Sequence, residues 1–196
     1  MHRFERLHLG INPGVALVRF DRQGIPRPML LDLGVAAAPG ELSGCWDLRC
    51  NVPAYTPPEL ICLNSQPAMA GQVGPASDVY GLGMVLYEML SGCPAYDYKL
   101  QNDEVVYQAV MSQAALPTGR TDLKNIPQIA ERAIEKRYSD RQGDILTFAR
   151  ELQSNLPPVP REKQPFKVNW RSVAIVIASA LVISLLLAFA VAVAGV

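Results

Sequence analysis

The sequence predicts a mainly α-helical domain that carries one β-hairpin and is followed by a transmembrane helix. Two apolar runs flank the turn-rich stretch DRQGIPR between Gly14 and Gly34, which is the pattern of a hairpin. The stretch SDVYGLGMVLYEMLSG at 77–92 is apolar on nearly every face, as is typical of a helix at the centre of a helical domain. Residues 173–196 are 24 residues without a charge, an amide or a histidine, a length that can cross a bilayer.

The other elements follow in chain order. Residues 35–76 are rich in Gly, Pro and Ser, which predicts a long loop with at most a short helix near 58–63. Ser77 and Gly92 are the expected N-cap and C-cap of the central helix. Three amphipathic helices are expected after it, at 103–113, 127–136 and 143–152.

The residues before the apolar C-terminal segment predict its orientation. Trp170 lies where an interfacial aromatic residue is expected, and four basic residues precede the span: Arg161, Lys163, Lys167 and Arg171. We therefore expect a single-pass protein of the cell membrane with a cytoplasmic N-terminal domain. The predicted division is a folded lobe at 1–155, a Pro-rich basic juxtamembrane linker at 156–171 and a transmembrane helix at 172–196.

Charge and cysteine content exclude two classes of function. The formal net charge is zero and no basic run is interleaved with aromatic residues, so nucleic acid is not an expected partner. The four cysteines include no C-x-x-C pair, so a structural zinc site is not expected.

Four motifs, in this order, carry a resemblance to a known family. They are LLDLG at 30–34, YTPPEL at 55–60, SDVYGLGMVLYEMLSGCPAY from Ser77, and EKRYSDR ending at Arg141. Together they resemble the larger lobe of bacterial-type serine/threonine protein kinases, where the first two correspond to D-F-G and to the region around A-P-E. The resemblance spans about 8–152 and implies a β-hairpin plus a helical bundle around a buried central helix.

The same resemblance implies that the catalytic loop is degenerate. Aligned with the family's H-R-D-L-K-P-E-N, the stretch HLGINPGV retains the histidine as His8, with Gly10 at the catalytic aspartate. Asn12 then takes the place of the lysine and Val15 that of the metal-binding asparagine, while Val52 replaces the threonine of G-T-P-x-Y. A glycine cannot accept a proton and a valine cannot bind Mg²⁺, so no catalytic residue is expected and His8 is expected in the core.

A few residues retain family positions. Asp32, in the D-F-G-like motif, is expected to bind a metal weakly if at all. The resemblance implies structural roles for the others, with Asp78 bonded to the catalytic-loop backbone and Glu59 paired with a buried Arg141. No G-x-G-x-x-G occurs, so no cofactor is expected, and ATP with Mg²⁺ is expected only if an upstream smaller lobe exists.

These residues predict a membrane-anchored, kinase-like protein, and they favour a protein without enzymatic activity over an enzyme. It would be a catalytically inactive pseudokinase that serves as a scaffold or regulator in signalling, with kinases or other signalling proteins as partners at the membrane. The first alternative is the C-terminal fragment of a transmembrane serine/threonine kinase whose nucleotide-binding lobe lies upstream. The second is a decayed gene product that retains only a functional anchor.

Overall fold

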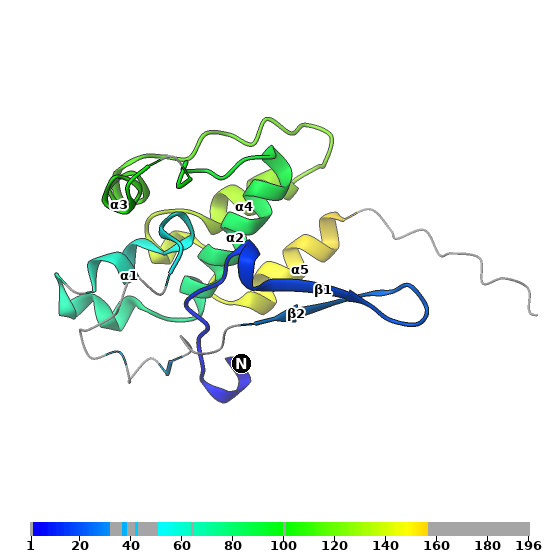
Figure 1. The fold of residues 1–196 in the computed structure, drawn as a ribbon, viewed down its shortest axis with the longest axis horizontal. Coiled ribbons are helices and arrows are strands. Elements are labelled where there is room, and N and C mark those ends of the chain that lie inside the picture. The colour runs from blue at the N-terminus through cyan, green and yellow to red at the C-terminus, as the bar shows by residue number, and fades with distance from the viewer. Residues whose placement is uncertain are drawn as a thin grey trace, which may run out of the picture. The chain divides into compact units, whose positions relative to one another are not determined.

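A computed structural model describes residues 2–31, 37–38, 42, 51–63, 65–99 and 101–156. The helices and strands in this part of the chain, shown in Figure 1, are β1 (Ala16–Phe20), β2 (Pro26–Leu30), α1 (Pro58–Cys62), α2 (Pro75–Ser91), α3 (Asp103–Ser112), α4 (Ile126–Ala133) and α5 (Ile145–Asn155). Short 3₁₀ helices lie at His2–Phe4, Pro13–Val15, Pro53–Tyr55, Pro67–Gln72 and Tyr138–Asp140. The described residues are therefore mainly helical, with one two-stranded sheet.

The predicted hairpin is confirmed. β1 and β2 pair antiparallel, with Ala16 opposite Leu30 and Phe20 opposite Pro26. Asp21 shapes the turn, because its Oδ1 accepts the backbone N–H groups of Gln23 and Ile25 at 2.9 and 3.0 Å. The second strand begins at Pro26, within the stretch that composition assigned to the turn. Every residue of both strands is exposed, and Figure 1 shows the hairpin projecting beyond α5.

α2 is the centre of the helical part. One side of it packs against α3 through Tyr80, Met84 and Val110, and another packs against α4 and α5 through Val79 and Phe148. Two glycines allow close approach, since a Cβ at Gly81 would lie 2.9 Å from the carbonyl oxygen of Ile11 and one at Gly83 would lie 2.5 Å from the Cβ of Ala133. The GLG of this helix therefore serves packing.

The start of α2 differs from its prediction. The N-cap is Gly74 and Pro75 occupies the first helical position, so the helix begins before Ser77. Proline suits that position because its missing N–H would have no helical partner there. Ser77 lies in the first turn, where its Oγ accepts the Gly74 N–H at 3.2 Å. Gly92 ends the helix as predicted, with a left-handed φ of 79°.

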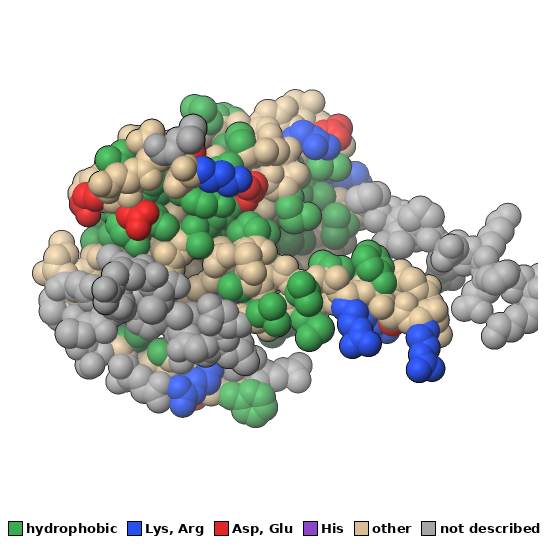
Figure 2. Space-filling view, viewed as in Figure 1, with side chains coloured by type: hydrophobic (Ala, Val, Ile, Leu, Met, Phe, Trp, Pro, Cys, Tyr) green, Lys and Arg blue, Asp and Glu red, His purple; other side chains and the backbone are tan. Residues whose placement is uncertain are grey.

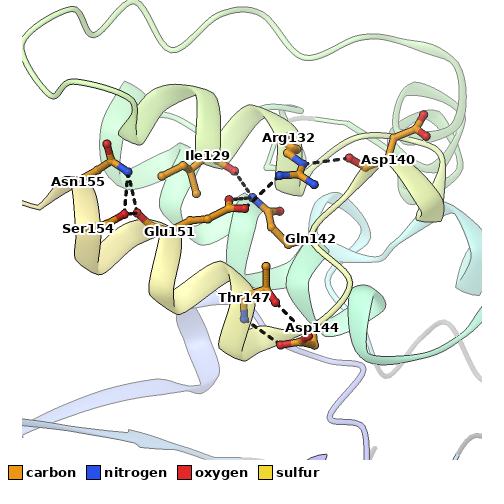
Figure 3. A network of polar contacts seen from close by, with 9 residues as sticks. All are labelled: Ile129, Arg132, Asp140, Gln142, Asp144, Thr147, Glu151, Ser154 and Asn155. Atoms are coloured by element: carbon orange, nitrogen blue, oxygen red, sulfur yellow. Dashed lines mark hydrogen bonds and ion pairs between the residues drawn. The ribbon is translucent and has the colours of Figure 1, made fainter.

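A polar network ties α4 to α5 (Figure 3). Glu151 on α5 accepts from Arg132 on α4 at 3.1 Å and from the amide of Gln142 at 2.8 Å. Asp144 caps α5 by accepting the Thr147 N–H at 2.8 Å. These contacts join α5 to α4 and to the segment between them.

The predicted membrane-spanning helix requires a correction. In the part of the chain that the structure describes, no helix combines the length and the apolar character needed to cross a bilayer. That finding contradicts a fold class ending in a transmembrane helix and the single-pass membrane localisation derived from it, and neither is carried further. Residues 172–196 themselves lie outside the described residues.

The division of the chain into three segments stays a prediction. Residues Met1–Leu156 group as one unit by their internal contacts. The predicted linker at 156–171 lies outside the described residues except for Leu156.

Candidate functional site

The loop from His8 to Val15 leads from the core to the hairpin. It follows a bridge between Leu7 and Ala37, and Leu9 holds a left-handed φ of 60°. A non-glycine residue in that region costs roughly 1–3 kcal/mol and persists only where its surroundings enforce it. Here the enforcement comes from α2.

Asp78, in the first turn of α2, holds this loop by its backbone. Its buried carboxylate accepts the N–H groups of His8 at 2.8 Å and Leu9 at 2.7 Å. Nε2 of His2 lies 2.7 Å from the same carboxylate. Asp78 is therefore engaged in shaping the loop.

His8 is a core residue with both ring nitrogens engaged. Its Nδ1 accepts the Gly10 N–H at 3.3 Å, so Nε2 carries the proton and donates to the carbonyl oxygen of Leu31 at 3.0 Å. The residue is 1% exposed. His8 thus joins the loop to the end of β2.

The three positions that align with the family's reactive groups are occupied by inert or locally engaged groups. Gly10 has no side chain, and Val15 offers only hydrocarbon beside its carbonyl, which accepts the Leu31 N–H at 2.8 Å. The amide of Asn12 is used on both ends: Nδ2 donates to the Gly10 carbonyl at 2.9 Å and Oδ1 accepts the Gly14 N–H at 2.8 Å. Asn12 therefore closes a local turn and caps the 3₁₀ helix at Pro13–Val15.

A cavity of about 420 Å³ opens beside this loop. Its wall consists of His2, His8, Ile11, Leu30, Pro75, Ile145 and Leu146 together with the carboxylates of Asp78 and Asp144. No Lys or Arg is among the described residues that line it. The two carboxylates have neither a lysine nor an arginine beside them in this lining, and the imidazole of His2 lies on Asp78, so the cavity disfavours a phosphate.

Asn51, the residue before Val52, links the loop to the segment before α1, and it was not identified from the sequence. The adjacent Asn51 donates from Nδ2 to the carbonyl oxygen of Leu9 at 2.7 Å. Val52 itself packs against the core, and its carbonyl accepts the Thr56 hydroxyl at 3.0 Å. The loop is thus tied to the segment before α1 by Asn51. The position of Asn51 directly before Val52 was the one feature of the sequence that could have pointed to this contact.

Arg141 and Glu59 form a buried bidentate ion pair. Nη1 and Nη2 of Arg141 lie 2.8 and 2.9 Å from the two oxygens of Glu59, and both side chains are at most 2% exposed. The other three N–H groups of Arg141 donate to the carbonyls of Glu135, Ala76 and Lys136. Ser77 donates to Glu59 at 2.7 Å. Every donor of the guanidinium therefore has an acceptor, as a buried charge requires.

Lys136, next to this pair, is a titratable group that the sequence did not single out. Its Nζ contacts the Tyr96 hydroxyl and donates to the Val110 carbonyl, so it joins α3 to the segment after α4. Burial, assisted by the charge of Arg141, lowers the pKa of Lys136 to about 8. Burial also raises the pKa of Tyr96 to about 12.

The last predicted site residue is Asp32. Asp32, the expected weak metal ligand, lies outside the described residues. Within the described part of the chain, no group of three or more His, Cys, Asp or Glu residues is placed to hold a metal ion.

Comparison with known proteins agrees with the motifs at a coarse level. No protein-family model matches the chain. Serine/threonine-protein kinase PknK of Mycobacterium bovis and that of Mycobacterium tuberculosis are each 28% identical over 160 residues, which are 82% of this chain and 13% of those proteins. CBL-interacting serine/threonine-protein kinase 1 of Arabidopsis thaliana is 32% identical over 83 residues, which are 41% of this chain and 17% of that protein.

The chain therefore spans a small fraction of the length of these relatives. The similarity extends over most of its own length. On this basis the chain is kinase-like, distantly similar to serine/threonine protein kinases.

Proposed function

We propose that this kinase-like chain is a catalytically inactive pseudokinase, which acts in signalling as a scaffold or regulator by binding other proteins. The observation that carries the proposal is the set of groups in the loop from His8 to Val15. At the positions of the base, the lysine and a metal ligand, the loop has no side chain, a locally engaged amide and a hydrocarbon.

Chemistry explains why these replacements matter together. Phosphoryl transfer depends on metal ions held against the phosphates, a cation on them and a carboxylate that orients the hydroxyl. A single general acid or base contributes roughly 10²–10⁴-fold. The cavity beside the loop, which has two carboxylates and neither a lysine nor an arginine among its described lining residues, also disfavours a nucleotide.

A phosphotransfer assay tests the proposal. The purified chain is incubated with γ-labelled ATP, Mg²⁺ or Mn²⁺ and a general acceptor protein, beside the Asp32→Ala/Gly34→Ala double variant as the background. We expect equal incorporation of label into the acceptor by both. Incorporation clearly above that of the double variant would overturn the proposal.

A second candidate is that the chain is the C-terminal part of a longer serine/threonine kinase with its nucleotide-binding lobe upstream. It is favoured by the relatives, which are named as kinases and are longer than this chain. The intact mass of the native protein separates the two, since a mass near 21.4 kDa supports the first candidate and a clearly larger mass favours the second.

A further inference from the structure

The hairpin presents an unusual amount of apolar surface. In β1, Leu17 is 49% exposed, Val18 55% and Phe20 65%. Both strands are exposed along their full length, although the apolar residues of β1 are of types that usually pack against other apolar groups.

The two edges of this sheet differ in their capacity to accept another strand. Asp21 donates to Ile25 and Leu31 donates to Val15, so the odd-numbered residues of β1 make the hydrogen bonds to β2. Val18 and Phe20 therefore direct their N–H and C=O groups away from β2. On the outer edge of β2, the matching positions are Pro26 and Pro28, which have no N–H to donate. Only the β1 edge can extend the sheet.

The positive charge of the hairpin favours an acidic partner at the β1 edge. Arg19 and Arg27 lie directly opposite each other on one face, an arrangement of like charges that is unfavourable without a counter-ion. Arg27 is 3.1 Å from Asp21, but Arg19 and Arg22 have no acidic partner among the described residues. A cavity of about 450 Å³ is lined by the three arginines with Phe20, Asp21 and Met29. Figure 2 shows basic side chains at the outer end of the hairpin and hydrophobic ones nearer the helices.

We propose that β1 is a docking edge for an extended, acidic segment of a partner protein, which adds to the sheet as a third strand. Its backbone pairs with Val18 and Phe20, its apolar residues cover the side chains of Val18 and Phe20 on one face, and its carboxylates neutralise Arg19 and Arg22 on the other side. A second copy of this chain fits less well, because each hairpin would bring the same net positive charge to the contact. The inference rests on the proposed function, for which it supplies the partner's chemistry.

Peptide binding to the purified full chain tests this proposal. The probe is a labelled, end-blocked nine-residue peptide of alternating valine and glutamate, and anisotropy reports its binding. We expect binding that weakens with added salt and weakens about tenfold in the Arg19→Glu/Arg22→Glu variant. Arg150→Glu, an exposed arginine on α5, is the matched control and leaves affinity unchanged.

The backbone part of the proposal is tested without altering the protein. Two versions of the peptide carry N-methyl groups on the odd or on the even residues. Strand addition predicts that one version fails to bind while the other binds like the parent, because only one edge of the peptide faces β1. Equal binding of both versions would overturn strand addition, and self-association of the chain that competes with the peptide for β1 would identify a second copy as the occupant instead. Neither result bears on the phosphotransfer assay, so the two proposals fail separately.

Discussion

The cluster around Arg141 and the loop from His8 to Val15 are both held by buried polar side chains, but the two regions differ in what is left to react. At Arg141 a complete set of donors meets a complete set of acceptors. In the loop, Asp78 holds the backbone while the aligned reactive positions carry Gly10, Asn12 and Val15. The contrast teaches that the hydrogen bonds shaping a kinase-like loop are separable from the groups that would act in it.

Removing Arg141 gives the largest expected effect. Arg141→Met leaves the Glu59 carboxylate buried without its cation, so we expect a loss of about 3–5 kcal/mol in the free energy of unfolding, measured by urea denaturation. The control is Arg137→Met, whose side chain is 81% exposed and lies 3.8 Å from Asp140. The free energy of unfolding of this control variant should differ from that of the native protein by less than about 0.5 kcal/mol. Similar losses in both variants would contradict a special role for the buried pair.

An intermediate effect is expected at the loop. Asp78→Asn replaces one acceptor by an amide that faces a backbone donor, so we expect a loss of about 1–3 kcal/mol. Hydrogen exchange should quicken first at the amides of His8 and Leu9, which donate to this carboxylate. Asp97→Asn, at an exposed position, serves as the control. If both amides remain as protected as before, Asp78 does not hold the loop.

The smallest effect is the pH dependence that Lys136 contributes. Its pKa is lowered from 10.5 to about 8 by burial, so between these values the unfolded chain retains the proton and the folded chain has released it. Raising the pH through this window therefore favours the folded state. Relative to Lys136→Met, the native protein should gain stability from about pH 8 to pH 10, by less than about 1 kcal/mol because the group is half-exposed. Parallel curves of the urea midpoint against pH for the two proteins would exclude this assignment.

The elements with a strong local signal were predictable from the sequence. The hairpin and α2 follow from apolar patterning and from the glycine that ends α2. Their predicted boundaries were less accurate. Ser77 is a residue type that favours the N-cap, so the start of α2 was placed too late, and Pro26 is a residue type that favours turns, so the start of β2 was placed too late. Pro75 is better suited to the first helical position, and Pro26 is tolerated at a free sheet edge.

Apart from the contacts of Asp78 and Arg141 that the resemblance implied, the links between distant segments were not predictable. His2 reaches Asp78 across 76 positions and Asn51 reaches Leu9 across 42. No spacing rule covers contacts of that kind, since the tertiary fold alone brings the segments together. The resemblance to kinases supplied Glu59 and Arg141 as a pair, but the carbonyls of Ala76, Glu135 and Lys136 that complete the cluster are backbone groups without any sequence signature.

Pro26 and Pro28 also set an upper limit on any assembly that begins at the hairpin. If two hairpins met edge to edge, both β1 edges would be consumed and only proline-bearing edges would face outward. Sheet growth would end at two chains, whereas an exposed apolar strand with two open edges could continue into a fibre. The two prolines therefore allow the molecule to expose an apolar strand with one open edge without the risk of polymerising.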